Sequence, residues 1–193
     1  MEVSFSQFCE DVAVRRLASE KGIKRGFYVD AGACHPVVGS NTLLLHKEGW
    51  RGINIEMVQE KVDLFNRLRP GDRNVCAALD RVERTVFYST NNGSMDQISA
   101  EPRRGSERSA MTRTLDSVLE AEGIASRTID YLNIDCERVD LRVLQGLSLK
   151  RYPVRILSIE ALDDQAEREI RVYVEGQGMR FVEKMRWTLI FES

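Results

Sequence analysis

The sequence has little that would mark a zinc protein, a secreted protein or a membrane protein. Its four cysteines lie far apart, with no C-x-x-C pair and no histidine at metal-ligand spacing, which argues against a zinc site or a disulfide framework. No apolar run approaches the roughly 18 residues that a membrane span requires. The N-terminus carries two early acids where a signal peptide would be basic. We therefore expect a cytoplasmic protein with reduced thiols and no membrane span.

The chain also lacks an excess of either charge. Its 28 lysines and arginines nearly balance 30 acids, giving a net charge of -2, so no global field attracts nucleic acid or an anionic membrane. We expect no nucleic-acid partner. A chain of 193 residues with 42% hydrophobic content can bury one sizeable core. This predicts a single domain over residues 1–193, with an N-terminal helical region at 1–25 and a core at 26–193.

Strand-like and helix-like segments alternate along the chain without repeats or low-complexity linkers. This alternation predicts an α/β domain built on a largely parallel sheet, and residues 89–113 form its least regular stretch. The expected strands are 27–29, 51–56, 74–79, 84–89, 129–135 and 154–162, followed by a closing hairpin at 180–193. The expected helices are 5–20, 41–49, 58–71, 114–123, 139–147 and 166–178, with Thr114 as the cap of its helix.

Three of the expected strands end in acids, namely Asp30, Glu56 and Asp135. In open α/β sheets, ligands bind where the carboxyl ends of the strands meet. Gly32 would let the backbone approach such a ligand closely, and Glu56 could accept hydrogen bonds from both hydroxyls of a ribose. The pattern therefore suggests a nucleoside ligand.

The glycine-rich loop of dinucleotide-binding proteins is absent. After Gly32 the next glycine is Gly39, and His35 and Pro36 lie between them, so no compact turn can cradle a pyrophosphate. An adenosine ligand without a pyrophosphate, such as S-adenosylmethionine, fits better. A nicotinamide-dependent oxidoreductase is a weaker alternative.

Five segments, in order along nearly the whole chain, resemble the FkbM family of methyltransferases. They are SQFCEDVAV, GFYVDAGACHPVVGSNTLLLHKEGWRGINIE, FNRLRPGDRNVCAAL, IDYLNIDCERVDLRVLQGL and WTLIFES. The resemblance implies a Rossmann-like class I methyltransferase fold with a seven-stranded sheet that binds S-adenosylmethionine. It also implies methylation of a hydroxyl on a sugar-containing or other small molecule, in polysaccharide, glycolipid or secondary-metabolite biosynthesis.

The resemblance also assigns residues to the cofactor. Asp30, Gly32 and Ala33 would line its methionine end, and Glu56 would bind its ribose hydroxyls, as the residues by themselves suggest. The other cofactor residues that the family pattern implies are Met57 and Ala77 beside adenine, and Gln7 and Asp11 near the amino-acid end. Ordinary core packing would explain Ala77 equally well, and a solvated helical turn would explain Gln7 and Asp11.

The S-N-T loop of Ser40, Asn41 and Thr42 has two compatible interpretations. Its side chains could donate hydrogen bonds to the methionine carboxylate of the cofactor. They could also cap the helix that we expect to begin at this point.

Methylation of a hydroxyl benefits from a group that accepts its proton. Asp135 and Glu137 lie two apart beyond a strand, so one could act as base and the other as orienter. The pair could instead hold a divalent cation, or Asp135 could cap the following helix. His35, beside the cofactor turn, is an alternative base. No residue pattern supports a metal site further.

Arg138 stands where the family usually has the glycine of D-x-E-G. Its guanidinium would suit a carboxylate or phosphate on the acceptor, and Arg104 belongs to a basic loop that could act likewise or be solvated. These arginines suggest an anionic sugar or a sugar nucleotide as acceptor. Alternatively, Arg138 blocks the acceptor, and the domain is a non-catalytic S-adenosylmethionine-binding or adenosine-binding module with a regulatory role.

Overall fold

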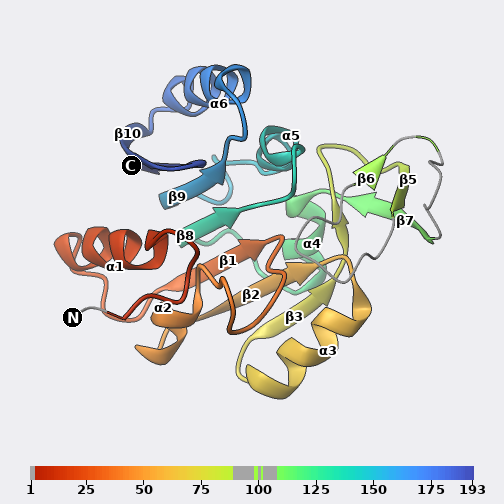
Figure 1. Cartoon of the computed structure of the whole chain (residues 1–193), viewed down its shortest axis with the longest axis horizontal. Coiled ribbons are helices and arrows are strands. Elements are labelled where there is room, and N and C mark those ends of the chain that lie inside the picture. The colour runs from red at the N-terminus through yellow and green to blue at the C-terminus, as the bar shows by residue number, and fades with distance from the viewer. Residues whose placement is uncertain (1–2, 89–97, 100, 102–107) are drawn as a thin grey trace.

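The main layer of the protein is a seven-stranded sheet in the order β10-β11-β9-β8-β1-β2-β3 (Figure 1). It is seen in a computed structural model that describes residues 3–88, 98–99, 101 and 108–193. The strands of this sheet are β1 (Phe27–Ala31), β2 (Arg51–Glu56), β3 (Arg73–Cys76), β8 (Ile129–Ile134), β9 (Val154–Glu160), β10 (Arg180–Met185) and β11 (Thr188–Glu192). Five strands are parallel, and β11 and β10 form an antiparallel hairpin at one edge. The α/β fold and its closing hairpin are therefore confirmed.

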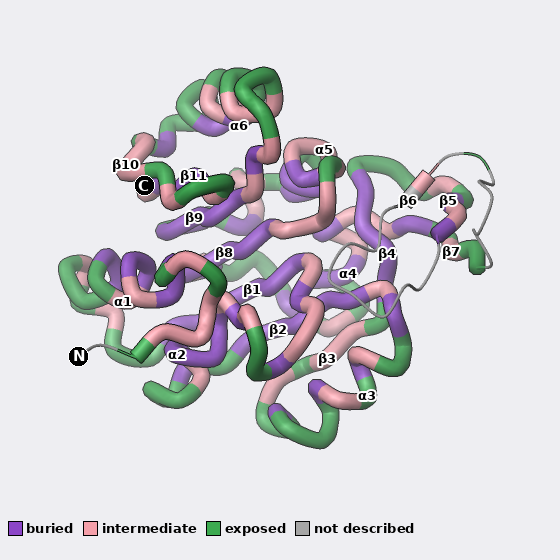
Figure 2. The backbone as a smooth tube through the Cα atoms, viewed as in Figure 1, coloured by how far each residue is buried: buried purple, intermediate pink, exposed green. Residues whose placement is uncertain are grey.

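Helices cover both faces of the sheet. Residues of α1 and α2 pack on one face with Tyr28 and Tyr131, whereas α4, α5 and α6 pack on the other with Val29 and Ala31. Alternate side chains of β1 thus point into two separate cores, and all five of its residues are buried (Figure 2). The helices are α1 (Glu10–Glu20), α2 (Leu43–Lys47), α3 (Gln59–Leu68), α4 (Leu115–Ala121), α5 (Asp140–Gln145) and α6 (Asp164–Gly176). In the described parts of the chain, no helix has both the length and the apolarity needed to cross a bilayer.

A second, small sheet differs from the expectation. Its order is β4-β7-β5-β6, formed by β4 (Ala78–Leu79), β5 (Thr85–Tyr88), β6 (Ile98–Ser99) and β7 (Arg108–Arg113). The expected strand 74–79 is thus divided between two sheets, and 108–113 is a strand rather than part of an irregular loop. The sequence RSAMTR has no apolar alternation, because this strand is mostly exposed and is held by pairing with β4 and β5.

The helix expected at 5–20 begins only at Glu10. The carboxylate of Asp11 accepts hydrogen bonds from Ser4 Oγ, Ser6 Oγ and the Phe5 backbone N–H, and these contacts hold the preceding segment outside the helix. The apolar spacing of the segment did not reveal this, because the competing interaction comes from a polar side chain. The Thr114 side chain caps α4 as expected, accepting from the Ser117 N–H.

A buried arginine fixes the loop that follows β1. Arg69, just after α3, is only 1% exposed. Its guanidinium donates to the Pro36 carbonyl, to Ser40 Oγ at 2.6 Å and to Thr42 Oγ1 at 2.8 Å. Thr42 Oγ1 in turn donates to Asp30 at 2.7 Å. The loop is therefore tied to the end of β1 through an arginine that is distant in sequence.

Replacing Arg69 by methionine should lower the free energy of unfolding by about 3 kcal/mol, because the Pro36 carbonyl and two hydroxyls would be left buried without their donor. Urea denaturation followed by circular dichroism measures the change. Arg67→Met is the matched control, since Arg67 lies two residues earlier and is exposed. Equal stability of the two variants would contradict a central role for the Arg69 network.

Candidate active site

The carboxyl ends of the parallel strands meet along one edge of the sheet and line two adjoining cavities. Ala31 of β1 pairs with Ile55 of β2 and Ile134 of β8, so the residues that follow these strands lie side by side. A narrow pocket of about 60 Å³ lies beside β2, and a cleft of about 950 Å³ lies beside β1 and β8. Both cavities are lined by Gly32, Cys34, Lys61, Asp135 and Glu137. An elongated ligand could occupy both cavities at once.

Asp30 lies in the floor of the cleft and is 1% exposed. One carboxylate oxygen accepts from Thr42 Oγ1, and the other accepts from Asn133 Nδ2 at 2.9 Å. Burial raises the pKa of Asp30, and these hydrogen bonds oppose the rise. The same contacts fix the carboxylate in one orientation.

Gly32 is required by the neighbouring strand. It has φ +81°, and a Cβ there would lie 1.9 Å from the Asp135 carbonyl oxygen. Any side chain would therefore displace the end of β8. Ala33 follows in the lining of the cleft, and its N–H donates to the Ile55 carbonyl. The D-x-G pattern thus joins two strand ends, a role separate from contact with a ligand.

Glu56, at the end of β2, is buried beside the narrow pocket. Its Oε2 accepts from the Cys34 N–H at 3.0 Å and its Oε1 from the Val58 N–H at 2.9 Å. Two backbone donors therefore fix the carboxylate against the pocket. Met57 and Ala77 line the same pocket and give it apolar walls.

The three residues of the S-N-T loop have different environments. Ser40 and Thr42 are buried and bound to Arg69, and Ser40 Oγ also accepts from the Leu43 N–H at the start of α2. Asn41 lines the cleft, and its Oδ1 is buried without a hydrogen-bond partner among the described residues. Within this loop, Asn41 is the residue with an acceptor available to a ligand in the cleft.

The N-terminal segment forms another wall of the cleft. Gln7 lines the cleft, whereas Asp11 is 0% exposed and is not among its lining residues. Through the hydrogen bonds described above, Asp11 anchors the segment that carries Gln7. Asp11 therefore supports the wall of the cleft but does not line it.

The residues expected to accept a proton, Asp135, Glu137 and His35, all line the cleft. Burial, followed by the charges of Asp140 and Glu137, raises the pKa of Asp135 to about 8. His35 Nδ1 accepts from the Val37 and Val38 N–H groups, both at 3.0 Å. A neutral imidazole in this arrangement carries its proton on Nε2, which makes that nitrogen a donor.

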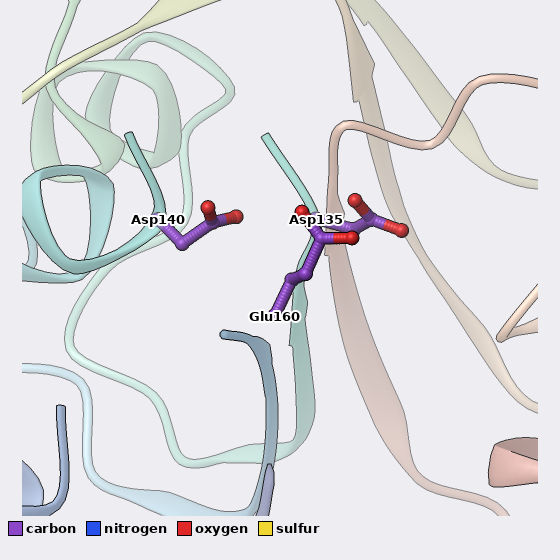
Figure 3. Close-up of side chains that lie close together, drawn as sticks. All are labelled: Asp135, Asp140 and Glu160. Atoms are coloured by element: carbon purple, nitrogen blue, oxygen red, sulfur yellow. The ribbon is translucent and has the colours of Figure 1, made fainter. Parts of the chain in front are cut away.

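Two further acids, Asp140 and Glu160, lie beside Asp135 and were not expected at the site (Figure 3). Burial raises the pKa of Asp140 to about 7, and burial with the charges of Asp135 and Asp140 raises the pKa of Glu160 to about 9. The sequence did contain a signal for Glu160, because this acid is the last residue of β9, just as Glu56 is the last residue of β2. The expected strand extended to residue 162 and concealed it. No comparable signal marks Asp140.

Arg138 lies at the rim of the cleft with a strained backbone. Its φ of +77° is in the left-handed region, and Glu137 before it has φ +52°. Its side chain is 62% exposed, with Nη1 4.0 Å from Asp163 Oδ2. Glycine in the family pattern fits this turn, which the arginine adopts at a cost of about 1 kcal/mol. Arg104, the other expected substrate-binding residue, lies outside the described residues.

Arg138→Gly should raise the free energy of unfolding by up to about 1 kcal/mol, because glycine adopts a positive φ without strain, although its flexible unfolded state offsets part of the gain. Urea denaturation measures the difference. Arg138→Ala removes the same contact with Asp163 but keeps the Cβ, so it should give no such gain. A glycine variant no more stable than the alanine variant would show that this turn is not strained.

The chain resembles known proteins in both sequence and fold. The model of the methyltransferase FkbM domain matches residues 30–181. The chain is similar to the crystal structure of methyltransferase FkbM from Methylobacillus flagellatus KT, with 12% identity and a TM-score of 0.57. That alignment covers 88% of this chain but 44% of the other, so this chain spans less than half of that protein's length.

A second structure is more weakly similar. It is the Burkholderia thailandensis 1,6-didemethyltoxoflavin-N1-methyltransferase with bound 1,6-didemethyltoxoflavin and S-adenosylhomocysteine, at 14% identity and a TM-score of 0.44 over 95% of this chain and 76% of that one. No protein of curated function matches the chain. Because the family match extends from the end of β1 into β10, the chain belongs to the FkbM family of methyltransferases.

Proposed function

We propose that this chain transfers a methyl group from S-adenosylmethionine to a hydroxyl oxygen of a small, sugar-containing acceptor. One observation carries the proposal: the oriented Glu56 carboxylate lies beside a narrow pocket that adjoins a large cleft lined by several acids. Membership in a methyltransferase family supports the cofactor. The choice of oxygen and of a sugar rests on the chemistry of the cleft described below.

The lining of the two cavities fits an adenosine with an amino-acid tail. Glu56 would accept the two ribose hydroxyls, while Met57 and Ala77 would contact the adenine ring. The amino-acid end would extend toward Gly32 and Asn41 in the cleft. There the unpartnered Oδ1 of Asn41 would accept an N–H from the ammonium group, which satisfies an atom that is otherwise buried without a donor.

When bound, the sulfonium supplies an already activated methyl group, so the protein mainly has to align the acceptor and exclude water. Gln7 and the segment anchored by Asp11 would cover the amino-acid end of the cleft. Asp135 and Glu137 line both cavities and would face the acceptor hydroxyl. In its ionised form, a carboxylate at that position orients the hydroxyl and accepts its proton as the new bond forms. For Asp135 this requires a pH near or above its raised pKa of about 8.

The cleft favours a hydroxylated acceptor over a strongly anionic one. Among the described residues of its lining, the acids are Asp30, Asp135, Glu137 and Glu160, whereas the cationic side chains are Lys61 and Arg138. Carboxyl groups form hydrogen bonds with the hydroxyls of a sugar, and those that are ionised repel phosphates and acidic sugars. An anionic group on the acceptor would have to lie at the rim, beside Arg138.

Glu56→Ala should weaken the binding of S-adenosylhomocysteine at least tenfold, about 1.4 kcal/mol, because the ribose hydroxyls would lose their shared acceptor. Isothermal titration calorimetry of the two proteins measures the change. Glu60→Ala is the matched control, since Glu60 is an exposed acid of α3 that pairs with Arg108. Absence of binding by the unchanged protein, or equal binding by all three, would contradict the cofactor site.

The acceptor class is tested by incubating the protein with S-adenosylmethionine carrying a labelled methyl group and a panel of glycosides, nucleotide sugars and heterocyclic amines. Label on a sugar hydroxyl, located by mass spectrometry of the fragments, is the expected result. Label confined to amine nitrogens would overturn the proposal of O-methylation while leaving the cofactor site intact.

A further inference from the structure

Three carboxylates from separate elements meet beside the cleft. Asp135 follows β8, Asp140 begins α5 and Glu160 ends β9. Each can offer one oxygen within 4.8 Å of the others, and Figure 3 shows the Asp140 carboxylate directed toward Asp135 and Glu160. We propose that these three residues form a binding site for a divalent cation of the Mg²⁺ or Mn²⁺ type. This inference goes beyond the proposed function and does not depend on it.

An orphaned atom supports the site independently of the clustering. Glu160 Oε2 is buried and has no hydrogen-bond partner among the described residues. Asp135 lies beside it, partly exposed, with its carboxylate crowded by the neighbouring acids Asp140 and Glu137. Buried carboxylate oxygens without donors are costly. A cation at the centre of the three side chains would bind the orphaned Glu160 oxygen and offset the crowding of negative charge at Asp135.

The surrounding side chains make this corner of the protein strongly acidic. Glu137 adds a fourth acid nearby, since its charge acts on both Asp135 and Glu160. Arg138 partly offsets the charge at Glu160, but its side chain is mostly exposed, near Asp163. Arg142 is bound to Asp80 through two hydrogen bonds of 2.8 Å. Both arginines thus lie near acids outside the cluster of three carboxylates.

The ligand set indicates which cations would bind. All three groups are carboxylates, which favour hard cations over the softer metals that prefer thiolate or imidazole. Around a cation with ligands at ~2.1 Å, neighbouring oxygens lie ~3 Å apart and opposite ones ~4 Å, so small side-chain rotations would bring the three oxygens into range.

One ligand is already held in position. The carboxylate of Asp140 accepts from the Cys136 N–H at 2.6 Å and from the Arg138 N–H at 3.0 Å, which fixes its direction as outer contacts do in metal sites. Asp135 and Glu160 line the large cleft, and Asp140 and Glu160 line a separate hollow of about 420 Å³. Open coordination positions would thus be reached by water or by an oxygen atom of the acceptor.

The proposal is tested by titrating the chelator-treated chain with MnCl₂ and counting free Mn²⁺ by electron paramagnetic resonance. We expect one saturable Mn²⁺ per chain, displaced by Mg²⁺, and binding at least about tenfold weaker in Glu160→Gln, because the number of charged ligands sets the affinity. Glu169→Gln is the matched control: this exposed acid lines the same 420 Å³ hollow but lies outside the cluster, and its loss should leave binding unchanged.

No saturable binding by the unchanged chain would overturn the site. So would equal weakening by the two substitutions, or binding that Glu160→Gln leaves intact, which would be adventitious. Thermal unfolding of each variant without metal checks that it is folded. Calorimetry with S-adenosylhomocysteine on the same samples keeps the two proposals distinct, since a chain that binds the nucleoside but not Mn²⁺ refutes the cation site alone.

Discussion

The buried guanidinium of Arg69 is the interaction on which the geometry of the site depends. It links the Pro36 carbonyl, Ser40 and Thr42 to the end of α3, and through Thr42 it reaches Asp30 in β1. An arginine without water must satisfy its donors within the protein, and five N–H groups in a fixed fork allow few alternative loop conformations. The loop that carries Asn41 into the cleft is therefore held against the end of β1 by buried hydrogen bonds.

A close backbone contact connects this half of the site to the other. The absence of a side chain at Gly32 lets the Asp135 carbonyl lie against the end of β1. The proposed cofactor and cation sites therefore adjoin each other at this contact. The carboxylates of Asp140 and Glu160 lie close to that of Asp135. Because Gly32 has no side chain, the end of β8 can approach β1, and this approach places the Asp135 carboxylate at the site.

The fold and the ends of β1, β2 and β8 could be predicted from sequence, because apolar runs that stop at Asp30, Glu56 and Asp135 are local patterns. The start of α1 and the strand β7 could not. Asp11 holds the segment before α1 through hydrogen bonds that apolar spacing does not encode, and β7 exists by pairing with strands distant in sequence. The contacts of Ser40 and Thr42 with Arg69 were likewise not predicted, because no sequence pattern indicates that an arginine is buried.

By itself, the sequence determined the alternation of strands and helices, the acids at three strand ends and the likeness to a methyltransferase family. These features depend on residues within a few positions of one another. Only the tertiary structure decided that Glu160 and Asp140 meet Asp135, that Arg69 is buried, and that Arg138 adopts a left-handed turn. The physical reason is that burial, charge crowding and backbone strain arise between segments whose distance is set by the packed sheet and not by their separation along the chain.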